Sequence, residues 1–352
     1  MKRVVQSSRL SARPGVPTFV LFFLLGIAAT GFSQQAEVTY FQGTANLKSG
    51  SGSLTPVDFG TTMNAGDSIV TGNDGVVQLD QTGGSQITVQ ANSVFTLQKR
   101  YQDSNQQTVM TTVLGAVSYR FAKLAGSPEP AIATMSSVAG IRGTVFTVYA
   151  ASDGTSRYEV TEGMVEVSSA GQSVDLTQNQ AVEVAAGAVP GKVEALHGSL
   201  DYSKWNSQKE QDFSQNPVAA LDAVGKQMDT FIAEFDKIEP VYVRLKSELD
   251  TNRAELKKLF DEGKKDEVQK LNSDKIRPLE IETTNAILTV RYWALSALSL
   301  RKYVMGRMFL INTLKHIRNL DDTNYKAFVD HFTKLDRSFR AAIVPSLVPL
   351  DI

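Results

Sequence analysis

The spacing of apolar residues changes near residue 200, and this change constrains the fold more than any other feature of the chain. Before it, apolar and polar residues alternate, as in Val77 and Leu79, and the pattern returns at Ile87 and Val89. Alternation with glycine-containing turns every 8–12 residues or so predicts short β-strands. After residue 200, apolar residues recur every three or four positions, which predicts amphipathic helices. The sequence therefore predicts an all-β N-terminal domain and an all-α C-terminal domain.

The predicted β domain covers residues 37–200. Pro56, Pro128 and Pro130 fall between its strand-like runs, as expected, because proline cannot donate a hydrogen bond to a neighbouring strand. Regular short strands of this kind build either a sandwich or a solenoid-like stack. Both architectures fit the pattern.

The predicted helical domain covers residues 201–352 and has four or five amphipathic helices, enough apolar stripes to bury the core of a bundle. Proline and helix-capping residues divide it. The expected helices begin at Asn216–Pro217, at Pro240 (ending near Gly263), after Pro278 (running to about Leu320) and at Asp322.

Residues 1–36 have the pattern of an export signal. Four basic residues precede an uncharged apolar stretch of ~17 residues, and small residues follow at Gly31 and Ser33. A cleaved signal peptide is the favoured interpretation, and an uncleaved N-terminal anchor is the alternative, because the stretch is close to the shortest that spans a bilayer. Either alternative predicts that the remaining chain is extracytoplasmic.

Composition excludes several function classes. The formal net charge is −1, which gives no electrostatic reason to expect nucleic-acid binding. The absence of cysteine rules out disulfides, thiolate metal sites and a cysteine nucleophile. The three histidines, His197, His316 and His331, have no metal-ligand spacing. We expect no catalytic residues, no metal, no cofactor and no enzymatic activity.

One segment of the helical domain is basic. No acid lies between Glu282 and Asp321, while basic residues recur among apolar ones. Such a helix could contact an anionic partner. The favoured alternative is a central bundle helix whose basic edge faces the acids of residues 248–267. The candidate contacts for an anionic partner are Arg291, Arg301, Lys302 and Arg307.

The β half resembles the FecR domain, which occurs in the extracytoplasmic parts of bacterial signalling and envelope proteins. The resemblance covers about residues 37–190 and is most specific at Val138–Phe146, whose sequence VAGIRGTVF is close to the family hallmark. Other matching stretches are AGDSIVTG at 65–72, GVVQL at 75–79, LGAV at 114–117 and VTEGMVEV at 160–167. The hallmark residues that we single out, for a structural or interaction role, are Gly140, Arg142, Gly143, Thr144, Glu162 and Gly163.

Arg142 has two interpretations. A guanidinium between two glycines could bind a carboxylate or a phosphate with its planar fork. Alternatively, Arg142 pairs with a nearby acid or with strand-end carbonyls and locks the turn. The second is favoured because residues 37–200 contain 14 acidic residues against 8 basic ones.

The resemblance implies a non-enzymatic interaction module. Members that regulate sigma factors carry an anti-sigma domain before the membrane segment and a docking domain after the FecR domain, and we expect neither here. The predicted function is an exported interaction or scaffold module of the bacterial envelope. A carbohydrate- or peptidoglycan-binding module and a membrane-anchored signalling component are the alternatives. The expected partner is an envelope protein or a cell-wall polymer, with a homo-oligomer formed through the helical domain as a further alternative.

Overall fold

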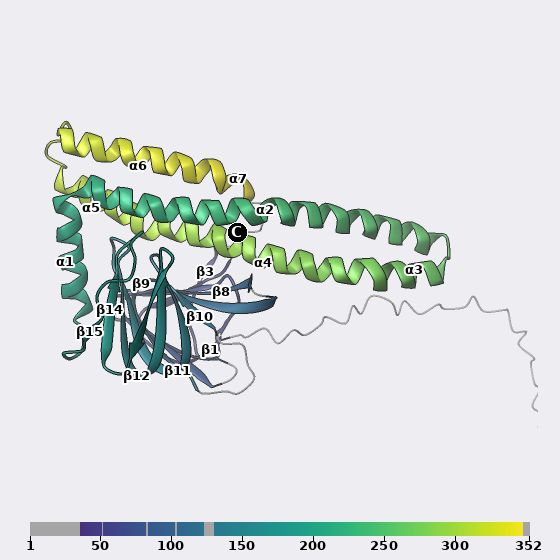
Figure 1. The fold of residues 1–352 in the computed structure, drawn as a ribbon, viewed down its shortest axis with the longest axis horizontal. Coiled ribbons are helices and arrows are strands. Elements are labelled where there is room, and N and C mark those ends of the chain that lie inside the picture. The colour runs from purple at the N-terminus through teal and green to yellow at the C-terminus, as the bar shows by residue number, and fades with distance from the viewer. Residues whose placement is uncertain (1–35, 51, 82–83, 103, 123–129, 348–352) are drawn as a thin grey trace, which may run out of the picture. The chain divides into compact units, whose positions relative to one another are not determined.

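The structure is a computed structural model that describes residues 36–50, 52–81, 84–102, 104–122 and 130–347. A strand-rich part comes first in the chain and a helical part follows (Figure 1). This order confirms the predicted change from strands to helices. The strands are β1 (Ala36–Gln42), β2 (Ala45–Lys48), β3 (Leu54–Pro56), β4 (Thr62–Met63), β5 (Ser68–Thr71), β6 (Val76–Gln81), β7 (Ser85–Val89), β8 (Val94–Gln102), β9 (Asn105–Arg120), β10 (Ala131–Ala133), β11 (Val138–Ala150), β12 (Ser156–Ser169), β13 (Gln172–Thr177), β14 (Gln180–Val184) and β15 (Glu194–Ala195).

Three long strands, β9, β11 and β12, change neighbours along their length and so connect the strand pairings. The first part of β9 pairs with β8 and β10, and the part after Gly115 pairs with β7 and β11. Gly115 has φ of +92°, and a Cβ there would lie 2.1 Å from the Ser93 hydroxyl oxygen. Only glycine fits both the conformation and the space, so Gly115 permits the bend.

The core of the strand-rich part consists of the residues that alternate in the sequence. Val77, Leu79, Ile87 and Val89 are all fully buried, as their period of two predicts. Tyr119 stacks on Phe146 with ring centroids 5.2 Å apart. Its hydroxyl forms a 2.8 Å hydrogen bond with Thr112, so the one polar atom of this buried ring is satisfied.

The helical part contains one very long helix where the sequence predicts two. Pro240 was expected to open a second helix, and this prediction is wrong, because α2 continues through it. Proline removes one backbone hydrogen bond, but the apolar stripe continues on both sides, through Phe235 and Tyr242, and its packing offsets the loss. The helices are α1 (Tyr202–Gln215), α2 (Pro217–Asp261), α3 (Lys265–Leu271), α4 (Arg277–Ser299), α5 (Gly306–Lys315), α6 (Thr323–Ala342) and α7 (Val344–Leu347), with π-helical segments η1 (Asn272–Ile276) and η2 (Leu300–Met305).

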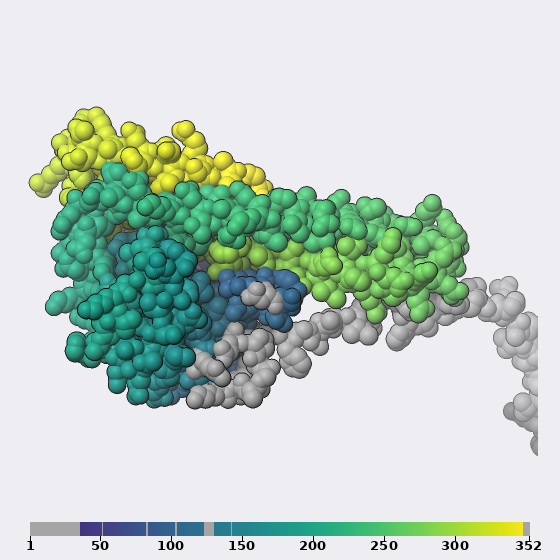
Figure 2. All heavy atoms as spheres, viewed as in Figure 1, coloured from purple at the N-terminus to yellow at the C-terminus, as the bar shows by residue number. Residues whose placement is uncertain are grey.

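The strands and helices share one apolar cluster. Val94, Val113 and Met135 of the strand-rich part pack with residues of α2, α4 and η2. Strand β8 is consequently buried on both faces from Val94 to Gln98. One face lies in the core of the strand-rich part, and α4 packs on the opposite face, which carries polar side chains. Figure 2 shows the helices lying against the strand-rich part. The residues from Gln34 onward form one compact unit.

Polar contacts fix α1 to the strand-rich part. The Trp205 indole Nε1–H and the Lys209 ammonium donate hydrogen bonds of 2.8 and 2.7 Å to the carboxylate of Glu183 on β14. The Tyr202 hydroxyl donates to the Ala150 carbonyl oxygen at 3.0 Å. These bonds hold α1 directly after the last strand, so the two parts are joined by more than the connecting chain.

The domain boundary and the export signal stay predictions. Strand β15 ends at Ala195 and α1 begins at Tyr202, on either side of the predicted boundary at residue 200. The export signal lies outside the described residues, apart from Ala36 at its end. Among the described helices, none combines the length and the apolar character that a bilayer crossing requires. The choice between sandwich and solenoid, and the bundle, likewise stay predictions.

Candidate functional site

The hallmark residues lie where β11 and β12 bend together. The regular pairing of the two strands is interrupted between Arg142 and Val145. Gly143 and Gly163 have positive φ of +56° and +84° at this bend. A Cβ on Gly163 would lie 2.6 Å from the Thr144 methyl carbon and 2.8 Å from the Gly143 carbonyl oxygen. At this bend β11 changes from pairing with β10 to pairing with β9, and the conformations of Gly143 and Gly163 permit it.

The other hallmark residues differ in exposure. Glu162 and Gly140 are exposed, and Thr144 is buried with no hydrogen-bond partner for its hydroxyl among the described residues. The backbone of Arg142 pairs with Met164, while its side chain lies outside what the structure describes. The two interpretations of its guanidinium therefore remain predictions.

The predicted basic contacts lie on α4, η2 and α5. Arg301 pairs with Asp336 of α6 and covers the Phe332 ring, and Arg307 lies 3.5 Å from a carboxylate oxygen of Glu210 on α1. Arg291 lies on α4, and Lys302 lies in η2. The acids that face Arg301 and Arg307 thus come from α6 and α1, not from residues 248–267.

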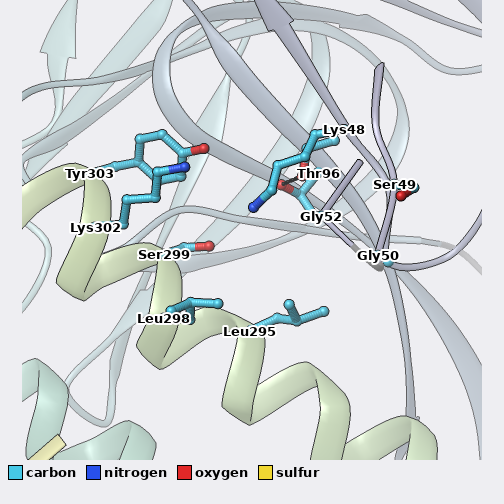
Figure 3. A pocket seen from close by; sticks show the side chains of 12 residues that line it. Lys48, Ser49, Gly50, Gly52, Thr96, Leu295, Leu298, Ser299, Lys302 and Tyr303 are labelled. Atoms are coloured by element: carbon cyan, nitrogen blue, oxygen red, sulfur yellow. Dashed lines mark hydrogen bonds between the residues drawn. The ribbon is translucent and has the colours of Figure 1, made fainter. Parts of the chain in front are cut away.

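Lys302 lines a cavity between the strands and the helices. The cavity has a volume of about 240 Å³. One side is formed by residues of β2, β5 and β8 together with Ser49, Gly50, Gly52 and Gly66, and the other by α4 and η2 (Figure 3). The lining residues are Lys48, Ser49, Gly50, Gly52, Gly66, Ser68, Thr96, Leu295, Leu298, Ser299, Lys302 and Tyr303.

Two lysines line the cavity, the half-buried Lys48 and the exposed Lys302. Neither Lys48 nor Lys302 has a carboxylate partner among the described residues. Burial lowers the pKa of the Lys48 ammonium below its ordinary value, and the charge of Lys302 lowers this pKa further. The nearby Asp67 is engaged elsewhere, because its oxygens accept backbone N–H bonds from Gly50 at 3.0 Å and Asn64 at 2.8 Å.

Hydroxyl groups surround the two ammonium groups. Ser68 and Thr96 share a 2.9 Å hydrogen bond, which uses one of their two hydroxyl hydrogens and leaves the other to point elsewhere. Figure 3 shows the hydroxyls of Ser299 and Tyr303 on the helical side, with Leu295 and Leu298 beside them. The arrangement can donate several hydrogen bonds to an anion while an apolar group contacts the leucines.

Two successive residues of the π-helical turn line this site. The Gly306 N–H donates to the carbonyl oxygen of Arg301, five residues earlier, so the turn holds one extra residue. Lys302 and Tyr303 both line the cavity, and the Lys302 ammonium lies 4.8 Å from the Tyr303 ring centroid. Arg301 instead pairs with α6. Arg301 and Lys302 thus have different neighbours, because successive residues of a helix point in different directions.

Sequence reasoning identified Lys302 but missed Lys48 and the hydroxyl residues of the cavity. Lys48 is a lone lysine at the end of a strand, and nothing local distinguishes it. Within the described residues, no cluster of three histidine or carboxylate side chains could hold a metal ion.

The strand-rich part is a β domain with long bent strands and a glycine-containing bend where β11 and β12 pair. Residues 67–166 match the family model described as FecR protein. The predicted resemblance is therefore confirmed for this segment, which contains the hallmark. No curated protein matches the sequence.

Two solved structures are similar to part of the chain. Both are crystal structures of a "putative anti-sigma factor" from Parabacteroides distasonis, at 2.50 and 1.65 Å resolution. The first is 15% identical with a TM-score of 0.32, and the second is 17% identical with a TM-score of 0.30. Each comparison covers 41% of this chain and 64% of the other, so the chain spans less than two thirds of these structures.

Proposed function

We propose that this protein is a non-catalytic, extracytoplasmic FecR-domain module that binds a protein partner in a bacterial envelope and serves a signalling or regulatory complex there. The observation that carries the proposal is the FecR match over residues 67–166, joined to helices that share its apolar packing. A partner bound to the helices would therefore be mechanically connected to the FecR domain.

The surface that we assign to the partner is an exposed apolar row at the end of α5. Leu310 and Leu314 lie on α5, and Ile317 and Leu320 follow it, all four exposed. Apolar rows that reach solvent commonly mark protein contacts. Arg307, which pairs with Glu210, and the exposed Arg318 lie close to the row in the chain, and the exposed Asp321 follows Leu320, so the edge of the row carries charges of both signs.

Export is tested by the N-terminus and the intact mass of the protein from the envelope fraction. A chain that begins near Gln34 or Glu37 supports a cleaved signal peptide. A chain that keeps residues 16–32 supports the anchored signalling component. A cytoplasmic chain with its first residues intact would overturn the extracytoplasmic proposal.

Partner binding is tested by a photo-cross-linking residue at position 314 of the full chain in intact cells. We expect a defined cross-link to an envelope protein that is lost in Leu310→Glu. Phe260→Glu is the control and should keep the cross-link, since Phe260 is also exposed but lies at the C-terminal end of α2. A cross-link only to a second copy, or only to lipid, would contradict the proposed partner.

Two alternatives, a carbohydrate-binding module and an enzyme, are tested with insoluble peptidoglycan. Retention of the purified protein on it, unaffected by Leu310→Glu, would favour the cell-wall-binding alternative. Release of soluble fragments that is abolished by a single-residue substitution would show catalysis and overturn the proposal.

A further inference from the structure

We propose that the cavity between β2 and η2 is a binding site for a phosphate monoester with an apolar substituent. This inference concerns a different surface from the α5 row and holds or fails independently of the compartment and of the protein partner. It rests on the charges, the hydroxyls and the apolar side of the cavity.

The two ammonium groups that line the cavity favour an anion with more than one negative charge. Lys48 and Lys302 come from distant parts of the chain and line the same cavity, without a carboxylate partner among the described residues. Burial and, after it, the charge of Lys302 both lower the pKa of Lys48, and a bound anion would act against both effects. A phosphate monoester carries about 1.5–2 negative charges at neutral pH and would neutralise both ammonium groups.

The donor geometry favours phosphate over carboxylate. A carboxylate is best matched by the planar two-pronged guanidinium of arginine, and no arginine lines the cavity. Lysines act as point charges and bind phosphate oxygens from several directions. The hydroxyls of Ser299, Tyr303 and the Ser68–Thr96 pair add donors around the same space.

The apolar side of the cavity indicates an ester and not a free ion. Leu295 and Leu298 line it on α4, opposite the loop that follows β2 (Figure 3). An apolar substituent placed against them would be removed from water, which adds affinity at ~25 cal/mol per Å² of buried apolar surface. Because β2 and η2 form opposite sides, a bound ligand would also clamp the strand-rich part to the helices.

The test is a calorimetric titration of the full chain with hexyl phosphate, inorganic phosphate and hexanoate at equal ionic strength. We expect saturable binding of hexyl phosphate, with inorganic phosphate and hexanoate each at least tenfold weaker. Lys48→Met and Lys302→Met should each reduce hexyl phosphate affinity about tenfold or more, because a hydrogen bond to a charged group contributes about 1.5–3 kcal/mol.

The matched control is Lys99→Met. Lys99 is another lysine whose pKa is lowered by burial, but it does not line the cavity, so this variant should bind like the parent. An NMR titration of the labelled lysines adds a readout that a purely structural role would not move: hexyl phosphate should raise the pKa of Lys48, since the anion favours the charged ammonium.

Three results would overturn the inference. No saturable binding of hexyl phosphate at millimolar concentration would remove the site. Hexanoate or inorganic phosphate binding as tightly as hexyl phosphate would contradict the ligand class. An equal loss of affinity in Lys99→Met would show that the effect is not local to the cavity. Thermal unfolding of each variant distinguishes loss of the site from loss of the fold.

Discussion

Arg301 and Lys302 are neighbours in the chain but serve different parts of the molecule: Arg301 pairs with Asp336 of α6, and Lys302 lines the cavity beside Lys48. Both lie in η2, and successive residues of a helix point in different directions. The first residue contributes to helix packing, and the second is free of any carboxylate among the described residues. The consequences of these and other local arrangements can be measured.

The bend at the hallmark predicts that Gly163→Ala destabilises the protein by about 2–4 kcal/mol, because a left-handed conformation and a close contact are both penalised. The added Cβ would lie 2.6 Å from the Thr144 methyl carbon. Gly171→Ala is the control, since its φ is also positive, at +76°, but nothing lies within 4 Å of the added atom. Urea unfolding should show the larger loss for Gly163→Ala, and equal losses would contradict the role of the contact.

Asn312 is fully buried on α5, and neither side-chain amide atom has a hydrogen-bond partner among the described residues. Leucine has nearly the same shape and no polar atoms to leave unsatisfied. Asn312→Leu should therefore stabilise the fold by about 1–3 kcal/mol. Asn252→Leu should instead destabilise it, because the Asn252 amide donates a 2.8 Å bond to the Glu248 carbonyl oxygen. Thermal unfolding compares them, and a loss of stability in both would refute the expectation.

Glu183 connects β14 to α1 through Trp205 and Lys209. Glu183→Ala should cost about 1–2 kcal/mol, since two charge-assisted hydrogen bonds are lost at a partly exposed site. The Trp205 indole should then shift its fluorescence emission to longer wavelength as it contacts water. Glu166→Ala on the exposed side of β12 is the control, and an unchanged spectrum in Glu183→Ala would show that α1 does not depend on this bond.

The lowered pKa of Asp336 predicts that the stability of the fold depends on pH in the acid range. Burial alone would raise the pKa of this carboxyl, but hydrogen bonds from Arg340 and Arg301 outweigh burial and hold the pKa below its ordinary value. A carboxyl with a lowered folded-state pKa stabilises the fold above its unfolded pKa of about 3.9, and this contribution is lost as the pH falls through the folded value. Asp336→Asn should therefore be less stable than the parent at pH 7, and the difference should shrink in acid.

The measurement for Asp336 is urea unfolding of both proteins across the acid range. Asp229→Asn is the control, because Asp229 is exposed and should give a difference that does not vary in this way. A gap between parent and Asp336→Asn that stays constant down to about pH 2 would show that another group carries the dependence.

Local pattern was sufficient for the change from strands to helices and for the FecR resemblance. The alternation at Val77 and Leu79 and the three-to-four spacing from Leu221 onward each reflect which face of an element is apolar, and that information is contained in a short segment. The helix across Pro240 was not predictable in the same way. The local rule that proline interrupts a helix predicts a boundary at Pro240. The helix continues because Phe235 and Tyr242, on either side of the proline, both pack against the rest of the helical part.

The sequence alone determined the order of strands and helices, the glycines needed at the bends and the family of residues 67–166, because these depend on local conformation and on short motifs. Only the tertiary structure decided that β8 is buried on both faces, that Arg301 and Lys302 face different neighbours, and that Lys48 meets Lys302 in one cavity. Those facts depend on which distant surfaces come together, and the energy of such contacts is absent from any local stretch of residues.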